Sequence, residues 1–428
     1  MNRYDRQILL IALPSIVSNI TVPLLGLIDV AIVGHMGDAA YIGAVAVGSM
    51  TFNLVYWLFG FLRMSTSGWT AQAYGRQDRE EANSILVQAV FTALAIAAGL
   101  IVLQSPLLWL MFRIIGPTPD VAPWAAAYFH IVIWGAPASL TLFALTGWFI
   151  GMQDTRIPMA VSILQNVVNI VASLALVYGL HMKVEGVALG TVVAQYAALV
   201  VAVGFALHKA GRLRLSRLSF GGRDFFTVNR DLFLRTLCLV AVNLYFTAAG
   251  ARQGAVILSV NTILLQLYLF FSYFMDGFAN AGEALCGRYY GAAAPVAFRR
   301  TLHRLFRWAV VVTVLYTVLY IVAGMPIVRL LTDETSVRLA ARDFIGWAWL
   351  IPAAGVLAFI WDGVFVGLTA TRGMLAASAV AALLFFVVYK STEGLLGNHG
   401  LWLAQIVYLA TRGVVQTIWY RLKIFNAP

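Results

Sequence analysis

GWFIGMQDTR, which runs from Gly147 to Arg156, returns later in the chain as GVFVGLTATR, from Gly363 to Arg372. Five of the ten positions are identical, and the two copies begin 216 residues apart in a chain of 428 residues. The glycines within each copy are four residues apart, a spacing that permits close packing of two helices. The same offset aligns Tyr74-Gly75 with Tyr290-Gly291, and an offset of 224 aligns Arg6, Asn19 and Gly26 with Arg230, Asn243 and Gly250. Because both offsets are close to half the chain, the sequence predicts two similar structural repeats.

The composition is that of a membrane protein. Hydrophobic residues make up 61% of the chain and charged residues 11%, with a mean hydropathy of +0.85. Ordinary soluble domains carry about 25% charged residues, and a membrane-spanning helix needs about 20 mostly apolar residues. We therefore expect an all-α polytopic membrane protein with twelve transmembrane helices, and not a soluble protein. The predicted spans are 8–33, 43–71, 84–104, 124–150, 157–180, 185–207, 232–258, 261–287, 305–328, 343–368, 372–389 and 400–420.

Basic residues are distributed unevenly between the two sides of the predicted membrane. Of the 29 Lys and Arg residues, 20 fall on the side of the N-terminus. Many of them lie between the sixth and seventh spans, and Arg235, at the start of the seventh span, is counted with them. Positive residues concentrate on the cytoplasmic side of membrane proteins, so both termini are predicted to be cytoplasmic, in a multi-pass protein of the inner membrane. The net charge of +11 then reflects topology and contact with the anionic headgroups of the lipid bilayer, and no nucleic-acid partner is expected.

Six predicted spans in each half restrict how the two repeats are related. Since six is even, both halves start and end on the same side, which makes the repeats parallel and relates them by an axis along the membrane normal. We expect an N-terminal lobe at 1–207, a cytoplasmic linker at 208–230 and a C-terminal lobe at 231–428. The two pseudo-symmetric lobes should form a V-shaped central cleft, the arrangement of a transporter whose substrate crosses between repeats. We expect the transporter to be a monomer.

Asp29 is the most informative charge predicted at bilayer depth, where a charge costs roughly 2.5–3.5 kcal/mol. It lies in GLIDVAIVG with no basic residue nearby in the sequence, and its counterpart in the second half is Gln253. A carboxyl group that lacks both water and a cationic neighbour favours its protonated form, so Asp29 is the candidate proton site. Pro14 and Pro23 precede it on the same predicted helix and make that helix able to bend. A purely structural hydrogen bond from Asp29 to an adjacent helix is the alternative.

A second polar group is predicted within the C-terminal lobe. Asp276 and Glu283 are seven residues apart and share one face of the eighth span, and Asp362 lies in the tenth span. Arg252, next to Gln253 in the seventh span, is a candidate ion-pair partner for one of these acids. Two interpretations stay open for this group: a buried network that stabilises the lobe, or a second site for a proton or cation.

Sequence motifs for enzymes and resident cofactors are missing. There is no P-loop lysine signature for ATP, no HExxH zinc helix and no GxSxG nucleophile turn. Cys238 and Cys286 lie in apolar segments, and the six histidines are scattered without the spacing of metal ligands. We expect neither an enzyme nor a cofactor, and no metal site beyond a weak Na⁺ site at Asp29.

The chain resembles the multidrug and toxic compound extrusion (MATE) family, and more narrowly its DinF branch. Pro14 matches the early proline of the family's first helix, and four segments carry the rest of the likeness. They are LIDVAIVGHMG at 27–37, GAVAVGSMTFNLVYWLFGFLRMSTSGWTAQAYG at 43–75, MDGFANAGEALCG at 275–287 and WDGVFVGLTATR at 361–372. The resemblance covers essentially the whole chain. It implies twelve helices in two six-helix lobes, and export of amphipathic, often cationic compounds in exchange for H⁺ or Na⁺.

By the same resemblance, Asp29 is similar to the first-helix carboxylate that couples transport to a cation in this family. Asn169 and Thr191 match polar partners of that carboxylate on the fifth and sixth helices. Where the family often has Asn-x-x-x-Asp in the fifth helix, this chain has NIVAS, in which Asn169 is followed by Ser173. Sodium needs several oxygen ligands whereas a proton needs one site, so the missing second carboxylate favours proton coupling over sodium coupling.

The predicted function is secondary active multidrug efflux by antiport with H⁺, with Na⁺ the less favoured coupling ion. Protonation of Asp29 would change its hydrogen bonds, bend the proline-containing helix and release the substrate outward. One alternative is a flippase for a lipid-linked precursor, which needs a cationic cleft. The candidate cationic residues of such a cleft are Arg63 and Arg252. Met64, next to Arg63, is a further candidate to line the cleft. A passive channel or a structural membrane protein is the other alternative.

Overall fold

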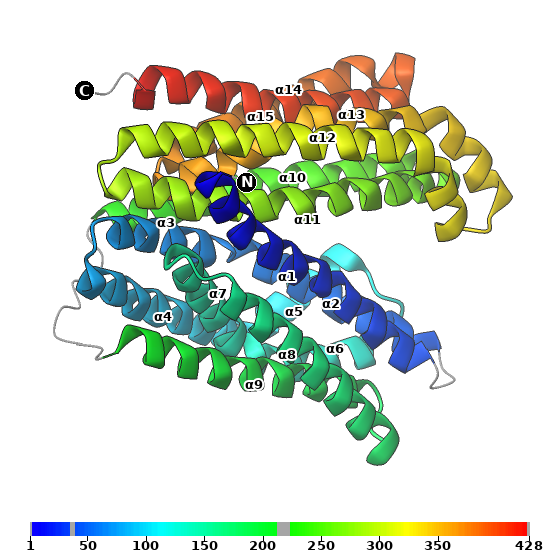
Figure 1. The fold of residues 1–428 in the computed structure, drawn as a ribbon. Coiled ribbons are helices and arrows are strands. Elements are labelled where there is room, and N and C mark those ends of the chain that lie inside the picture. Colours follow the sequence, from blue (N-terminus) through cyan, green and yellow to red (C-terminus); the bar gives the residue numbers. More distant parts are fainter. Residues whose placement is uncertain (1, 35–38, 212–222, 426–428) are drawn as a thin grey trace. The chain divides into compact units, whose positions relative to one another are not determined.

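The computed structural model describes residues 2–34, 39–211 and 223–425, and within these ranges the regular structure is helical, with no strand (Figure 1). Ten helical segments of the described part are long and apolar enough to cross a membrane. The prediction of an all-α, multi-pass membrane protein is therefore confirmed, while the count of twelve spans stays a prediction.

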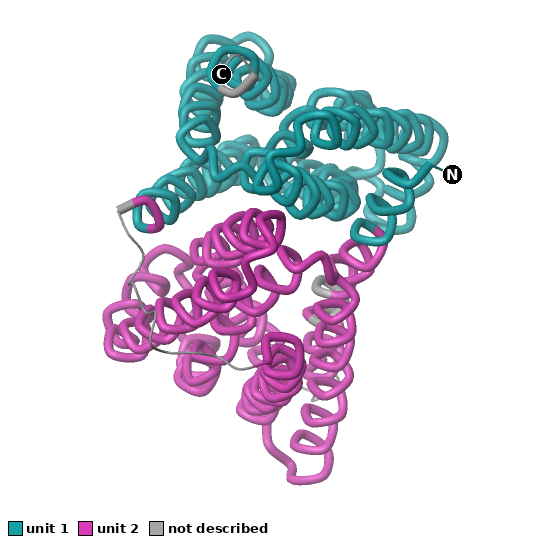
Figure 2. Tube along the Cα trace, turned by 60° about the vertical axis from the view of Figure 1, so that its left-hand side comes forward, with its two compact units in different colours: residues 1–12, 226–428 teal, residues 13–225 magenta. Residues whose placement is uncertain are grey.

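The helices form two compact units, which Figure 2 draws in different colours. The N-terminal unit comprises Leu13–Phe225, and the C-terminal unit comprises Met1–Ala12 together with Phe226–Pro428. The first twelve residues thus cluster with the second half of the chain, whereas the sequence placed them in a lobe at 1–207. Of the linker predicted at 208–230, residues 212–222 lie outside the described residues.

The helices divide between the units in chain order. α1 (Arg3–Gly34) begins in the C-terminal unit and continues into the N-terminal unit. The N-terminal unit also contains α2 (Ala39–Leu58), α3 (Phe61–Gly75), α4 (Arg79–Val102), α5 (Gln104–Ile115), α6 (Ala122–Val132), η1 (Ile133–Gly135), α7 (Ala136–Gly151), α8 (Arg156–Leu174), η2 (Ala175–Gly179) and α9 (Val184–Ala210). The C-terminal unit contains nearly all of α10 (Arg223–Arg252), then α11 (Ala255–Gly291), α12 (Pro295–Leu331), α13 (Thr335–Gly367), α14 (Thr371–Leu396), α15 (Asn398–Trp419) and η4 (Tyr420–Phe425).

No span was predicted between the third and fourth spans, and α5, which lies there, is a helix of only 12 residues, shorter than a membrane span. One prediction about the limits of the spans was wrong. The predicted seventh span, 232–258, ran through a helix end. α10 stops at Arg252, and Gly254, whose φ is 108°, leads into α11. Glycine accepts this backbone conformation without the steric penalty of a side chain, so Gly254 marks the turn that hydropathy alone did not reveal.

Both units use the same helix pairings. In the N-terminal unit α3 packs against α4 and α7, and in the C-terminal unit α11 packs against α12 and α13. Likewise, α8 packs against α9 as α14 packs against α15. The 216-residue repeat in the sequence therefore corresponds to a repeat in the tertiary structure.

Equivalent turns repeat down to the backbone conformation. Gln153, after α7, has a φ of 65°, and Thr369, after α13, has a φ of 52°. In each turn the next N–H closes a bond to the carbonyl oxygen five residues back, from Asp154 to Phe149 and from Ala370 to Phe365, both at 2.9 Å. This is the Schellman turn, which usually places glycine at the left-handed position. Both copies keep a residue with a side chain there, so the repeat preserves even a strained backbone position.

The repeated phrase also brings equivalent helices together, backbone against backbone. A Cβ atom added at Gly147 would lie 2.3 Å from the carbonyl oxygen of Arg63, and one added at Gly363 would lie 2.1 Å from that of Ala279. Arg63 and Ala279 are themselves 216 residues apart. Only glycine fits at these two positions, because a side chain would separate α7 from α3 and α13 from α11. The packing role predicted for these glycines agrees with this geometry.

Gly363→Ala is expected to destabilise the protein by about 1–3 kcal/mol, since the added methyl group meets rigid backbone and the helices must shift. Gly346→Ala in the same helix is the matched control, because a Cβ there meets nothing within 4 Å. The control should be neutral or slightly stabilising, since alanine favours helix more than glycine does. Thermal unfolding in detergent measures both variants. Equal midpoints for the two would contradict the packing argument.

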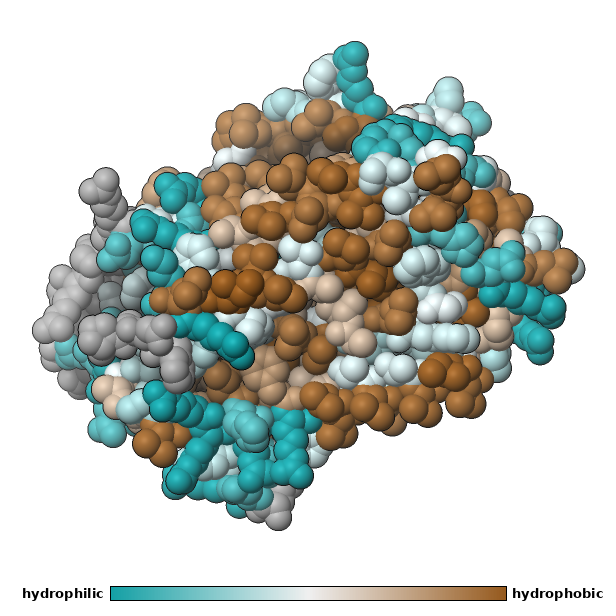
Figure 3. Space-filling view, turned by 90° about the horizontal axis from the view of Figure 1, so that it is seen from above, coloured by the Kyte–Doolittle hydropathy of each residue, from teal (hydrophilic) through white to brown (hydrophobic). Residues whose placement is uncertain are grey.

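The surface agrees with a lipid environment. Seven aliphatic residues of α12, each more than half exposed, recur at helical spacing: Val310, Val311, Val314, Leu315, Val318, Ile321 and Val322. Figure 3 shows one face of the molecule, on which brown hydrophobic side chains form a broad band with teal hydrophilic groups toward its ends. A helix of this length that exposes aliphatic side chains is typical of one whose surface contacts the hydrocarbon core of a lipid bilayer and not water.

Candidate functional site

The apolar second half of α1 holds one acidic residue, Asp29. Its side chain is 4% exposed, and its Oδ1 atom has no hydrogen-bond partner among the described residues. No basic side chain of the described part of the chain pairs with it. A carboxyl group buried in this way can be kept neutral by a proton more easily than it can be kept ionised without a counter-ion. Asp29 is therefore buried as the sequence predicted, and its role as a proton site stays a prediction.

Pro14 and Pro23 both lie within α1, which is one helix of 32 residues. Proline has no N–H group to donate within a helix, so a helix that contains prolines bends more easily at them. Between the prolines, Thr21 is held to α8: its Oγ1 lies 3.0 Å from Ser162 Oγ, and its carbonyl oxygen accepts a bond from Asn166 Nδ2 at 3.0 Å. The weakened stretch of α1 is therefore tied to a neighbouring helix just before Asp29.

Tyr128 on α6 connects Asp29 to polar residues of α9. The tyrosine hydroxyl interacts electrostatically with Asp29 and hydrogen-bonds to Thr191, and it lies 3.4 Å from Ser49 Oγ. Its ring is buried against α2, where a Cβ atom at Gly48 would come within 2.2 Å of it. Sequence reasoning missed Tyr128. The available signal was a lone hydroxyl in the apolar run of α6, and nothing in the run points to Asp29.

Asn169, Ser173 and Thr191 come together where α8 packs against α9. Asn169 Nδ2 donates to Thr191 Oγ1 at 3.0 Å, and Thr191 Oγ1 donates to the carbonyl oxygen of Val187 at 3.1 Å. Ser173 lies beside Gly190, since a Cβ atom there would be 2.3 Å from Ser173 Oγ. Asn169 Oδ1 and Ser173 Oγ are buried without a partner among the described residues. The predicted residues thus share one neighbourhood, although Tyr128, and not Asn169, provides the link to Asp29.

The chemistry of this neighbourhood is limited by its single carboxyl group. Besides Asp29 and Tyr128, which interact electrostatically, it offers only the amide oxygen of Asn169 and the hydroxyls of Ser173 and Thr191 on α8 and α9. In the described part of the chain, no group of three or more His, Cys, Asp or Glu side chains could hold a metal ion. One acid with hydroxyl neighbours can take up and release a proton, and it supplies little negative charge to hold a sodium ion in place.

Asp362 on α13 is the centre of a buried network in the C-terminal unit. Arg235 and Arg412 both donate to its Oδ2 atom, Arg412 at 2.5 Å, and Gln416 donates to its Oδ1 atom at 2.6 Å. All four side chains are buried. Two guanidinium groups surround one carboxylate, so these groups together carry a positive charge. A cation is therefore repelled from Asp362 and not attracted to it.

This network corrects two expectations. Arg252, the expected partner of a buried acid, is exposed at the end of α10, with its guanidinium carbon 5.9 Å from the centre of the Tyr245 ring. Arg235, which the sequence assigned to the cytoplasmic side, is instead buried in α10 and paired with Asp362. The sequence shows that a buried acid needs a counter-charge, but partners 127 and 50 residues away are chosen by helix packing.

The other predicted polar residues of this unit differ in burial, and none of them is hydrogen-bonded to Asp362 in the contacts that the structure gives for that carboxylate. Glu283 on α11 is 2% exposed, whereas Asp276 is half-buried and accepts a hydrogen bond from Ser272 Oγ at 3.5 Å. Gln253 follows α10 and donates to the carbonyl oxygen of Ala249 at 3.4 Å. Their roles stay predictions.

Arg63 and Met64 lie on α3 in the N-terminal unit, and both are half-buried. The backbone of Arg63 forms the contact with Gly147 of α7 described above. Whether their side chains line a transport path stays a prediction.

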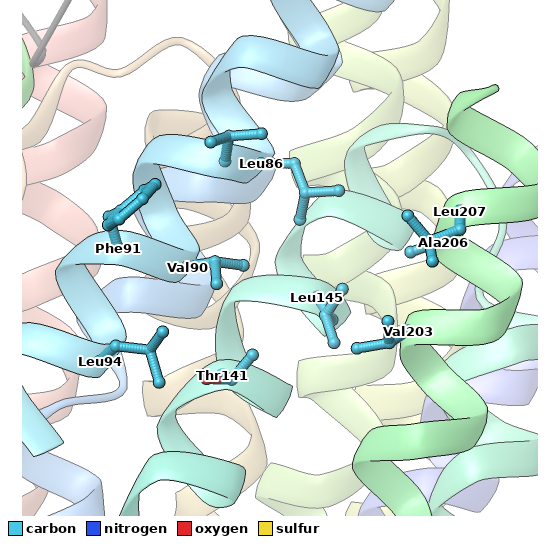
Figure 4. A pocket seen from close by; sticks show the side chains of 10 residues that line it. Leu86, Val90, Phe91, Leu94, Thr141, Leu145, Val203, Ala206 and Leu207 are labelled. Atoms are coloured by element: carbon cyan, nitrogen blue, oxygen red, sulfur yellow. The ribbon is translucent and has the colours of Figure 1, made fainter. Parts of the chain in front are cut away.

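A cavity of about 210 Å³ lies between α4, α7 and α9 (Figure 4). It is bordered by aliphatic and aromatic side chains, with Thr141 as the one polar residue. Phe91, Leu94 and Leu207 at its edge are more than 40% exposed. The cavity offers no charge to a cationic ligand, so it is distinct in chemistry from the neighbourhood of Asp29.

Known proteins match this chain over nearly its whole length. A family model described as MatE matches residues 14–174 and 232–389. DNA damage-inducible protein F of Escherichia coli K12 is 39% identical over 425 residues, which cover 97% of this chain and 92% of that protein. A probable multidrug resistance protein NorM of Acinetobacter baylyi is 25% identical over 243 residues, which cover 55% of this chain and 53% of that protein.

Solved structures share the fold. A MATE crystal structure in the bent conformation matches with a TM-score of 0.90 at 18% sequence identity. The match covers 99% of this chain and 96% of that one. At this identity the likeness concerns the arrangement of helices alone.

Proposed function

The chain belongs to the MatE family, whose members are transporters and not enzymes, and from this premise we propose that it exports amphipathic and cationic small molecules by antiport with protons. The relative named a probable multidrug resistance protein supports this substrate class. We place both termini in the cytoplasm, because 20 of the 29 basic residues fall on their side of the predicted membrane. A monomer in the inner membrane is part of the same proposal.

The observation that carries the proposal is the state of Asp29, buried in α1 without a basic partner among the described residues. An ionised carboxylate at this place attracts a cationic substrate, and a protonated one does not. Proton and substrate therefore compete for one site, which is the thermodynamic requirement for exchange.

Sodium is the less favoured coupling ion. Asn169, Ser173 and Thr191 add neutral oxygen atoms near the site, but Ser173 stands where a second carboxylate would be needed to hold Na⁺ firmly. A proton requires only the carboxyl group itself.

The proposed cycle uses the contacts of α1. A proton that enters from outside binds Asp29 and changes its interaction with Tyr128. Since Tyr128 hydrogen-bonds to Thr191, the change reaches the α8–α9 pair. α1 then bends at its prolines, the substrate leaves outward, and the proton is released to the cytoplasm in the inward-facing state.

The network around Asp362 supports a stabilising role and not a second cation site. Its carboxylate already accepts bonds from Arg235, Arg412 and Gln416. We therefore assign the coupling proton to the N-terminal unit.

Uptake of ethidium, a fluorescent organic cation, into inverted membrane vesicles tests the proposed function. We expect accumulation when the vesicle interior is acidic, loss of accumulation when an ionophore collapses the pH gradient, and no effect of replacing Na⁺ by K⁺. Vesicles without the protein provide the background. Accumulation that follows a sodium gradient, and not the pH gradient, would overturn proton coupling. Translocation of a lipid-linked pyrophosphate without ethidium transport would favour the flippase.

A further inference from the structure

We propose that Asp5 and Gln7 fasten the start of α1 permanently to the C-terminal unit, so that bending of α1 near Asp29 moves that unit. The inference rests on the proposed function. It assigns a positioning role to residues outside the coupling site. The anchor segment, defined as residues 3–12 of α1, carries it.

Polar contacts hold the anchor segment to α11 and α12. Asp5 accepts hydrogen bonds from Arg304 Nη1 at 3.4 Å and from Trp308 Nε1 at 3.3 Å. The hydroxyl of Tyr289 donates to Gln7 Oε1 at 2.9 Å. The side chain of Asp5 is only 13% exposed, so its ion pair with Arg304 is partly shielded from water. Such a pair is stronger and more specific than one at an open surface.

Apolar burial reinforces these contacts. Ile8, Ile11 and Ala12 on the anchor segment are at most 4% exposed, and the ring of Tyr4 meets that of Tyr289 edge-on at 6.4 Å between centroids. The anchor segment is therefore held in the C-terminal unit by buried apolar side chains as well as by hydrogen bonds. The division of the chain into units reflects this packing, since it groups the first twelve residues with the second half.

Beyond the anchor segment, the same helix is attached to the N-terminal unit. Thr21 bonds to Ser162 and Asn166 of α8, and the carbonyl oxygen of Ile32 accepts a bond from the Tyr178 hydroxyl at 3.4 Å. Pro14 lies between the two attachments. Asp29 is 17 residues beyond Ala12, about 25 Å along a helix axis. Because α1 is attached at both of its ends, a bend at its prolines must either reorient one attached end relative to the other or break one attachment.

The corresponding residues of the second repeat make different contacts. With the offset of 224, Gln7 corresponds to Asp231 and Ile11 to Arg235 on α10. Asp231 accepts a hydrogen bond from Thr371 at 3.3 Å, and Arg235 pairs with Asp362, so α10 is fastened within its own unit. Only the first three residues of α10 are grouped with the N-terminal unit, whereas the first ten residues of α1 are grouped with the C-terminal unit. The longer attachment to the other unit belongs to the helix that carries Asp29, where a mechanical link can act.

Charge exchange tests the anchor. Asp5→Arg and Arg304→Asp are each expected to lower proton-driven ethidium export about tenfold or more, while ethidium affinity stays within about twofold, and the double variant should recover much of the export. Asp333→Asn is the control, since it removes an exposed ion pair, with Arg338, from the same unit. Normal export by both single variants, in vesicles where the wild type exports, would overturn the anchor. Failure of the wild type itself would instead reject the proposed function.

Cross-linking separates a permanent anchor from a gate that opens in each cycle. Asp5→Cys and Trp308→Cys, introduced with Cys238→Ala and Cys286→Ala, are joined by a short bifunctional thiol reagent. Before cross-linking this variant should export ethidium poorly, because it lacks the contacts of Asp5 with Arg304 and Trp308. The cross-link should restore export, because a permanent contact does not need to open. Export that falls further on cross-linking, and recovers when a cleavable cross-link is cut, would show a gate and contradict the anchor. This readout also holds if the charge variants fold poorly.

Discussion

Asp29→Asn is expected to reduce proton-driven ethidium export to the background of vesicles without the protein. The amide has the size of the protonated acid but can neither release a proton nor attract a cation. Its Oδ1 position is already buried without a partner, so the substitution should leave folding intact. Ethidium accumulation at an imposed pH gradient, corrected for the amount of protein in the membrane, measures the effect.

Asp120→Asn is the matched control, since Asp120 is exposed and lies outside the helices. It should export like the wild type. Asp29→Glu should keep part of the activity, because it retains an ionisable group at a shifted position. Concentrative, gradient-driven export by Asp29→Asn would contradict the proposed role of the carboxyl group.

Asp362→Asn is expected to destabilise the protein by about 3–5 kcal/mol, the usual effect of removing one partner from a buried ion pair. The change leaves the buried guanidinium groups of Arg235 and Arg412 without their carboxylate. The loss should appear as a lower midpoint of thermal unfolding in detergent and as reduced amounts of protein in the membrane. Asp333→Asn, at an exposed pair, should change the midpoint little.

A compensating variant separates stability from coupling at this site. Replacing Asp362, Arg235 and Arg412 together by Leu, Met and Leu removes all three buried charges, and such replacements are often neutral or stabilising. The triple variant should unfold near the wild-type midpoint and still show proton-driven export. A well-folded triple variant that binds ethidium but has lost its dependence on the pH gradient would show that Asp362 belongs to the coupling machinery.

Much of the fold could be predicted because it follows from local patterns. Long apolar runs identify membrane helices, and the copies beginning at Gly147 and Gly363 identified a repeat that the structure shows in helix pairings, turns and glycine contacts. Asp29 could be singled out because a charge in an apolar run is unusual whatever surrounds it. These inferences need no knowledge of which helices touch.

The parts that could not be predicted depend on contacts between distant residues. Arg235 looked like one more cytoplasmic charge, since nothing in α10 shows that Asp362 will lie beside it. Tyr128 looked like an ordinary aromatic residue of a membrane helix, and its link to Asp29 exists only once α1 and α6 are in place. The attachment of the anchor segment to α12 joins residues 299 and 303 positions apart. Tertiary packing decides all three.

The most direct test of the account is the number of protons released when ethidium binds to the purified protein in weakly buffered detergent solution. Competition at Asp29 predicts that the wild type releases protons on binding, that ethidium affinity rises with pH as the carboxyl group ionises, and that Asp29→Asn releases none. Equal proton release by the wild type and Asp29→Asn, or ethidium binding by the wild type with no proton release at any pH, would contradict it.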